Sequence, residues 1–133
     1  MNSSELEAKY LPYVRRVSGV LLLPAAEAIH LLEDSQSVNV KLIGIEAFRL
    51  PEGGGIQPSM EFSNISYGTV AEKDGETEFN PDLRLRTPWN SDPEALENTR
   101  ALIAEGVANG YSWYEVSLED LESNELLFFR RDA

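Results

Sequence analysis

The chain has 133 residues, no cysteine and one histidine, and its 23 acidic and 11 basic side chains give a formal net charge of −12. This length is typical of one domain, so we predict a single domain over residues 1–133. The absence of cysteine excludes disulfides and thiolate chemistry and is typical of a cytoplasmic protein. The negative charge is unsuited to a phosphate backbone, so we expect no nucleic-acid partner.

A short helix is predicted near the N-terminus, from Ser4 to Tyr10. Ser3 or Ser4 can accept a hydrogen bond from the first free backbone N–H groups, with Glu7 in the reciprocal capping-box position. Pro12 interrupts the helix early, because proline lacks the N–H that a helix interior requires.

The next stretch looks like an export signal only in part. Arg15 and Arg16 precede an apolar run that ends at Leu23. Pro24 interrupts the run and Glu27 follows it, whereas a membrane span needs about 20 apolar residues. We therefore expect neither export nor membrane insertion.

The first principal helix is predicted over about residues 24–36. Pro24 suits a first helical turn, and apolar residues recur at the spacing of one helix face: Ala25, Ala28, Ile29 and Leu32. The polar run Asp34–Ser37 ends the helix, because such side chains compete for backbone hydrogen bonds. His30 lies away from the apolar stripe, which favours a solvent-facing histidine over a catalytic base.

A long hairpin is predicted next. Val38–Leu50 is rich in branched and aromatic residues and should form the main core strand, buried on both faces over Leu42–Ile45. Pro51–Gly55 then reverses the chain, and Ile56–Ile65 returns beside it, with Pro58 near an edge or a bulge.

A second hairpin is predicted over Thr69–Phe79, because Asp74–Gly75 accepts the positive φ angles of a tight turn. Leu83–Arg86 alternates apolar with basic residues, which predicts a short, half-buried strand.

The second principal helix is predicted over about residues 93–109. Asp92 supplies a capping oxygen, Pro93 suits the first helical position, and Gly110 suits the residue just past the end. Gly106 inside the helix costs about 1 kcal/mol relative to alanine, which indicates close packing there.

Two more strands are predicted in the C-terminal part. Tyr111–Leu118 alternates, with Tyr114, Val116 and Leu118 on one face and Tyr111, Trp113 and Glu115 on the other. Leu126–Phe129 is predicted as a final apolar strand. The chain is therefore predicted to be an α+β domain, in which a mainly antiparallel sheet of about five or six strands packs against two principal helices.

No catalytic or metal-binding constellation is legible in the sequence. Gly53–Gly55 lacks the lysine of a phosphate-binding loop and does not lead into a helix. A serine triad would need His30, and no Gly-x-Ser-x-Gly elbow occurs. The acids around Asp74 lack the spacing of a calcium loop. We predict no enzymatic activity, no cofactor and no bound metal.

Two acidic groups in the downstream part of the chain are the predicted partner-binding residues. Residues 1–50 hold six acids and five bases, whereas residues 51–133 hold seventeen acids and six bases. The first group surrounds the second hairpin turn, where alternate strand positions would give a common face: Glu72, Asp74, Glu76 and Glu78. The second group mixes acids with rings, as binding of Arg and Lys requires: Tyr111, Trp113, Glu115, Glu119, Asp120 and Glu122. Plain solubility remains an alternative explanation of both groups.

The order of the elements carries a resemblance to a known group. A helix, a long strand at Leu42–Phe48, a glycine hairpin, a helix start at Asp92–Ala95 and an aromatic, acidic strand at Tyr111–Glu119 follow one another. In this pattern the acidic, cysteine-free chain resembles the small immunity proteins of bacterial toxin systems. The resemblance implies an inhibitor that neutralises a basic toxin or nuclease, so the expected partner is a basic protein.

Two other classes of protein stay open. A small-ligand-binding domain or an enzyme would use a pocket between sheet and helices that contains one of three titratable residues: Glu46, Glu61 or His30. An adaptor or a homo-oligomer would instead present an apolar patch made of three aromatic residues: Trp89, Trp113 and Phe128.

Overall fold

The computed structural model describes residues 1–65, 69–73, 76–80 and 93–128, with side chains described for residues 1–63 and 94–128. The elements follow in the order α1 (Ser3–Tyr10), η1 (Leu11–Tyr13), β1 (Arg15–Val17), β2 (Val20–Pro24), α2 (Ala25–Ser35), β3 (Val40–Arg49), β4 (Gln57–Ile65), β5 (Thr69–Lys73), β6 (Glu76–Asn80), α3 (Pro93–Ala108) and β7 (Trp113–Asp120). The predicted α+β class is confirmed, with three α-helices among the described residues in place of two principal ones.

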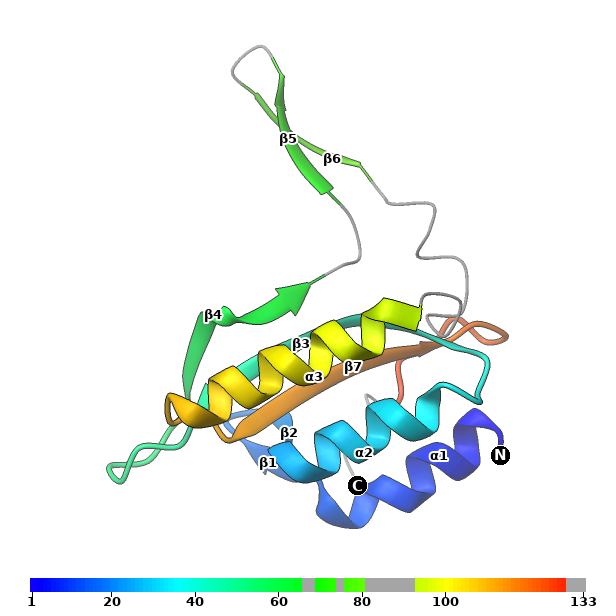
Figure 1. The fold of residues 1–133 in the computed structure, drawn as a ribbon, viewed down its shortest axis with the longest axis horizontal. Helices are drawn as coiled ribbons and strands as arrows, with labels where there is room; N and C mark the ends of the chain where they lie inside the picture. Colours follow the sequence, from blue (N-terminus) through cyan, green and yellow to red (C-terminus); the bar gives the residue numbers. More distant parts are fainter. Residues whose placement is uncertain (66–68, 74–75, 81–92, 129–133) are drawn as a thin grey trace.

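The sheet is antiparallel and has the strand order β1-β2-β7-β3-β4 (Figure 1). The predicted long hairpin is β3 with β4, and its loop uses positive φ angles at Gly54 and Gly55. The predicted second hairpin is β5 with β6, which pair as a separate two-stranded sheet. The predicted strand Leu83–Arg86 lies outside the described residues.

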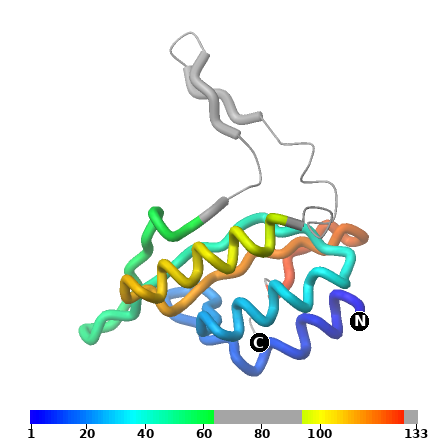
Figure 2. Tube along the Cα trace, in the orientation of Figure 1, coloured from blue at the N-terminus to red at the C-terminus, as the bar shows by residue number. Residues whose placement is uncertain are grey.

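The helices α2 and α3 cover one face of the five-stranded sheet, and α1 lies beside α2 (Figures 1 and 2). The core lies between the sheet and these helices and includes the fully buried side chains Leu6, Leu31, Leu32, Ile103, Tyr114 and Leu118. The predicted alternation along β7 is confirmed, because Tyr114, Val116 and Leu118 are buried and the residues between them are only partly so. One face of β7 therefore belongs to the core.

The N-terminal helix begins one residue earlier than predicted. Its cap is Asn2, whose Oδ1 accepts a hydrogen bond from the Glu5 N–H at 2.8 Å, while the Asn2 N–H donates to Glu5 Oε1 at 3.2 Å. Asparagine caps a helix as well as serine does, so the capping box shifts from Glu7 to Glu5. Glu7 has a different role: its Oε2 accepts from the Phe128 N–H at 2.6 Å and ties α1 to the C-terminal segment.

The apolar run before Pro24 is a strand that the sequence interpretation missed. Val20–Pro24 forms β2, and it pairs with the three-residue strand β1 through a tight turn. Ser18 and Gly19 both have positive φ angles, 51° and 81°, as a two-residue hairpin turn of the primed type requires. Pro24 ends the strand, and the first principal helix starts at Ala25.

Two further predictions were wrong in detail. Leu42 and Ile43 are only half-buried, so β3 is not buried on both faces over the whole of Leu42–Ile45. The C-terminal apolar residues do not form a strand among the described residues; Leu126 makes one bridge to Glu119, and Phe128 then leaves the extended conformation with a φ of 69°. This segment still adds Leu127 and Phe128 to the core.

Candidate functional site

The acids of the second hairpin are divided by its register. Glu72 pairs with Thr77, Glu76 pairs with Lys73, and Glu78 pairs with Ala71. Because register positions alternate along a strand, Glu76 and Glu78 belong to one alternate set of positions and Glu72 to the other. The prediction that all the hairpin acids share one face is therefore wrong for Glu72. Asp74 lies outside the described residues.

The aromatic residues of the second predicted group contact arginines of the chain itself. The Arg15 guanidinium lies over the Trp113 ring at 5.5 Å, and the Arg49 guanidinium lies over the Tyr111 ring at 5.4 Å. The Tyr111 ring also packs on Phe62, with 5.7 Å between centroids. Cation–π sites that a partner's Arg or Lys could use are thus already occupied.

Two acids of the same group are engaged in the fold. Glu119 lies opposite Lys41 on β3, and Glu119 Oε2 is 3.6 Å from Lys41 Nζ. Asp120 shapes the turn after β7, since its carboxylate accepts from the Glu122 N–H at 3.2 Å and from Ser123 Oγ at 3.0 Å. Glu122 itself is exposed in that turn, so it remains accessible to a partner.

Glu115 lies next to another carboxylate. It is the cross-strand partner of Glu46, and both side chains are half-buried. Burial, with the Glu46 charge as a second cause, raises the pKa of Glu115 above its usual range. The fold therefore disfavours the charged form of Glu115, and this residue is a weak contributor to an attractive negative surface.

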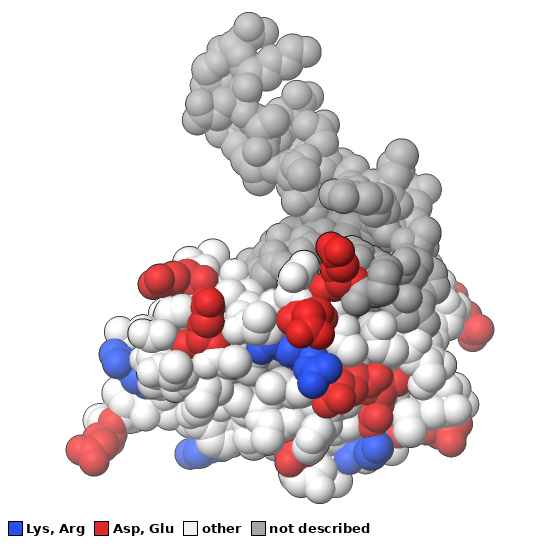
Figure 3. All heavy atoms as spheres, viewed as in Figure 1, with Lys and Arg blue, Asp and Glu red and all other residues white. Residues whose placement is uncertain are grey.

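A third acidic group, which the sequence interpretation missed, lies on the adjoining helices α2 and α3. Its members are Glu33, Glu94, Glu97 and Glu105, which are exposed, and Glu27 and Asp34, which are half-buried. Red side chains are spread over this helical face, with smaller blue areas between them (Figure 3). We call these six residues the helical acidic face. The sequence feature that could have identified these six residues is that each lies off the apolar stripe of its helix.

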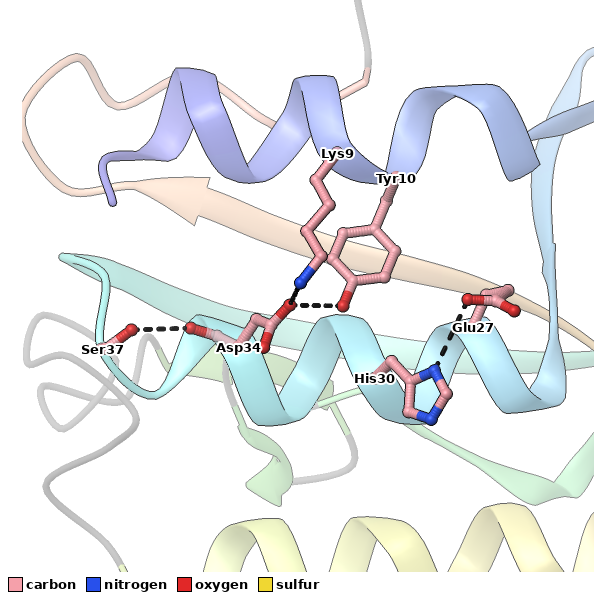
Figure 4. A network of polar contacts seen from close by, with 6 residues as sticks. All are labelled: Lys9, Tyr10, Glu27, His30, Asp34 and Ser37. Atoms are coloured by element: carbon pink, nitrogen blue, oxygen red, sulfur yellow. Dashed lines mark hydrogen bonds and ion pairs between the residues drawn. The ribbon is translucent and has the colours of Figure 1, made fainter.

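A polar network joins α1 to α2 (Figure 4). Asp34 Oδ2 accepts from Lys9 Nζ at 2.6 Å and from Tyr10 Oη at 2.5 Å. Burial and the bond to Asp34 raise the pKa of Tyr10 above its usual range. Although partial burial opposes it, hydrogen bonds from Lys9 and Tyr10 hold the pKa of Asp34 below its usual range. The network is a structural link between helices.

His30 lies at the edge of this network and is exposed, as predicted. Its Nδ1 is 3.5 Å from Glu27 Oε2 (Figure 4). Both residues line an open depression of about 410 Å³ together with Tyr13 and Glu33. The described side chains here include no serine or threonine beside His30 that could act as a nucleophile.

A larger pocket than this depression lies elsewhere, between the β1–β2 hairpin, β7 and the segment after β7. Its volume is about 650 Å³. Apolar side chains form most of its wall, including Leu21, Leu23 and Leu127, and its charged residues are Arg16 and Glu115. None of the three titratable residues expected in a ligand pocket lines it: Glu46, Glu61 and His30.

The aromatic patch expected of an adaptor is not assembled on the described surface. Phe128 is buried and Trp113 is half-buried beneath Arg15, while Trp89 lies outside the described residues. Among the described residues, the exposed large apolar side chains are scattered, with Leu11 and Tyr13 on η1, Met60 on β4 and Val107 on α3.

Comparison with protein-family models gives no match, and no curated protein or solved structure is significantly similar to this chain. Within the described ranges, no helix is long and apolar enough to cross a membrane. The same residues contain no cluster of three or more histidine, aspartate or glutamate side chains that could hold a metal ion.

Proposed function

We propose that the protein binds a basic protein partner through its negative surface and inhibits it, in the manner of an immunity protein that neutralises a toxin or nuclease. The observation that carries the proposal is the helical acidic face, where six carboxylates from two adjoining helices are at least partly exposed. A field of this kind steers a cationic partner and raises its association rate.

The helical acidic face suits a partner better than the segment after Gly110 does. In that segment Glu119 is paired with Lys41, Asp120 is engaged in a turn, and the charge of Glu115 is disfavoured. On the helices, Asp34 is likewise paired, with Lys9, but Glu33, Glu97 and Glu105 are exposed acids, with Arg100 as the basic residue between the last two. We therefore place the partner over α2 and α3.

Charge reversal at matched sites tests both the function and its location. One variant combines Glu33→Lys, Glu97→Lys and Glu105→Lys on the helices; the control combines Glu72→Lys, Glu76→Lys and Glu78→Lys in the hairpin and changes the net charge equally. Basic proteins retained by the wild-type chain from its native host are identified, and their association rates are measured between roughly 50 and 300 mM salt.

The expected result is a wild-type association rate that falls steeply with salt, and a helical variant that associates at least ~10-fold more slowly than the hairpin control. Co-expression with the partner should protect cells when they carry the wild type or the hairpin control, and should fail to protect them when they carry the helical variant. Binding that does not respond to salt would contradict charge steering, and a hairpin control that loses as much as the helical variant would refute the location.

A further inference from the structure

The strand β7 pairs with β3 along one edge, and along its other edge it pairs first with β2 and then with the segment at Leu127. The pairing along this second edge is broken at one residue. The Ser112 carbonyl accepts from the Ala25 N–H at 2.9 Å, Tyr114 pairs with Leu23, and the Leu118 carbonyl accepts from the Leu127 N–H at 2.9 Å. Residues with even numbers therefore direct their backbone groups to this edge, because the direction alternates along an antiparallel strand. By the same alternation, the N–H and C=O of Val116 point to this edge.

No described residue pairs with Val116 on that side. The strand β2 pairs with β7 only at Leu23 and Pro24. Its earlier residues pair with β1 alone, as Leu21 does with Arg16. At the other end, Phe128, the last described residue, has a positive φ of 69° and is itself not extended. Val116 is only 7% exposed. Buried backbone groups nearly always have a hydrogen-bond partner, and leaving them unpaired costs free energy, so this break calls for one.

The pocket of about 650 Å³ lies at this break, and Val116 lines it. Its volume falls within the range of roughly 300–1,000 Å³ typical of small-molecule sites. The wall is mainly apolar, formed by residues such as Leu21 and Leu127. Of its two charged residues, Arg16 already has an interaction within the chain, and the charged form of Glu115 is disfavoured. An apolar ligand without net charge fits this lining.

The geometry of the break also limits the ligand's length. Only Glu115, Val116 and Ser117 separate the last pair with β2 from the bond to Leu127, which is a window of about 10 Å at the rise of a strand. A longer polypeptide strand would collide with β2 or with the segment at Leu127. The window holds one residue pair.

We propose that this pocket binds a neutral, apolar N-acylated amino-acid derivative. Such a molecule carries one N–H and one C=O on either side of a single carbon, and these groups complete with Val116 the two hydrogen bonds of one antiparallel residue pair. Its side chain and acyl group would lie against the apolar wall at Leu21, Leu23 and Leu127. This binding is independent of the partner proposed above.

The test uses the full chain, N-hexanoyl-L-leucinamide as the probe, and backbone amide spectra recorded by NMR. Saturable binding should shift the Val116 amide resonance and slow its exchange with solvent at least ~10-fold, with smaller effects at Tyr114 and Leu118. The analogue methylated on the leucine nitrogen lacks the donor and should bind at least ~10-fold more weakly.

Two matched variants complete the test. Leu126 lies at the pocket and Val107 lies on α3, and both are exposed, so Leu126→Glu and Val107→Glu should leave the fold intact. We expect Leu126→Glu to abolish probe binding and Val107→Glu to retain it. Equal binding of the methylated analogue, shifts centred away from Val116, or a Val116 amide already protected in the free protein would overturn the proposal.

Discussion

The two faces of β7 differ in the interactions that their side chains make. On the face toward the helices, Tyr114, Val116 and Leu118 are buried and belong to the hydrophobic core. On the other face, Trp113 lies under an arginine, Glu119 is paired with a lysine, and the residues there are only half-buried. One strand thus combines a face whose contribution depends on packing with a face whose contribution depends on charge, so substitutions on the two should differ in size and in pH dependence.

The packed face has its tightest contact where Tyr114 meets α3. The Tyr114 hydroxyl donates to the Ile103 carbonyl at 3.2 Å, and burial raises its pKa to about 12. A Cβ atom at Gly106 would lie 2.0 Å from that hydroxyl oxygen. Glycine is therefore needed at this helix position because the Tyr114 ring approaches so closely. The backbone at Gly106 does not have the positive φ that would require glycine for its conformational freedom.

The largest expected effect comes from Gly106→Ala. Alanine favours a helix by about 1 kcal/mol over glycine, but its methyl group overlaps the Tyr114 hydroxyl, and overpacking of a core costs about 1–3 kcal/mol. We expect a net loss of stability in urea unfolding. The matched background is Tyr114→Phe, which lacks the hydroxyl; there the same substitution should cost much less. Equal costs in the two backgrounds would show that the overlap is not the cause.

A smaller effect is expected from Asp34→Asn, which breaks the polar network on the packed side. The variant loses the Lys9 charge pair and weakens the bond from Tyr10, which should lower stability by about 0.5–1.5 kcal/mol at neutral pH. Because the folded-state pKa of Asp34 is lowered, its stabilisation is present above the ordinary aspartate pKa and is lost as pH falls through the lowered value.

Urea unfolding of both proteins across the acidic range checks this sign. The difference between wild type and Asp34→Asn should shrink toward zero in acid. Ser37→Ala serves as the control, because Ser37 donates only to the backbone carbonyl of Asp34 and its loss should carry no such pH dependence. A difference that persists unchanged in acid would mean that the carboxylate charge is not what stabilises.

The sequence predicted those parts of the fold that local patterns determine. The stripe of α2, the end of α3 at Gly110, the glycine loop between β3 and β4 and the alternation of β7 each lie within one segment, whereas the predicted cap Asp92 lies outside the described residues. Close packing at Gly106 was also predicted, because glycine in a helix interior needs a reason. The strand β2 was missed, because its partner β1 has only three residues and two of them are arginines.

The candidate sites depended on contacts that no local pattern contains. The helical acidic face combines residues from α2 and α3, which lie far apart in the sequence. The proximity of Glu46 to Glu115 follows from the register of β3 with β7, which includes a bulge between Leu42 and Gly44. The pocket at Val116 exists because β2 departs from β7, and such a break in pairing is decided by tertiary packing.

The smallest expected effect, and the one that tests the charged face of β7 directly, comes from Glu115→Gln. Like charges on cross-strand partners destabilise a sheet, so removing the Glu115 charge beside Glu46 should raise stability by about 0.2–1 kcal/mol at neutral pH. Because the folded-state pKa of Glu115 is raised, the penalty is fully present above that raised value and is absent below the ordinary glutamate pKa. Urea unfolding should therefore show a gain at neutral pH that disappears in acid, with the exposed Glu122→Gln as a control that changes little. A loss of stability at neutral pH would mean that the Glu115 carboxylate makes a favourable contact that outweighs the repulsion from Glu46. Substitutions on both faces of β7 would then lower stability.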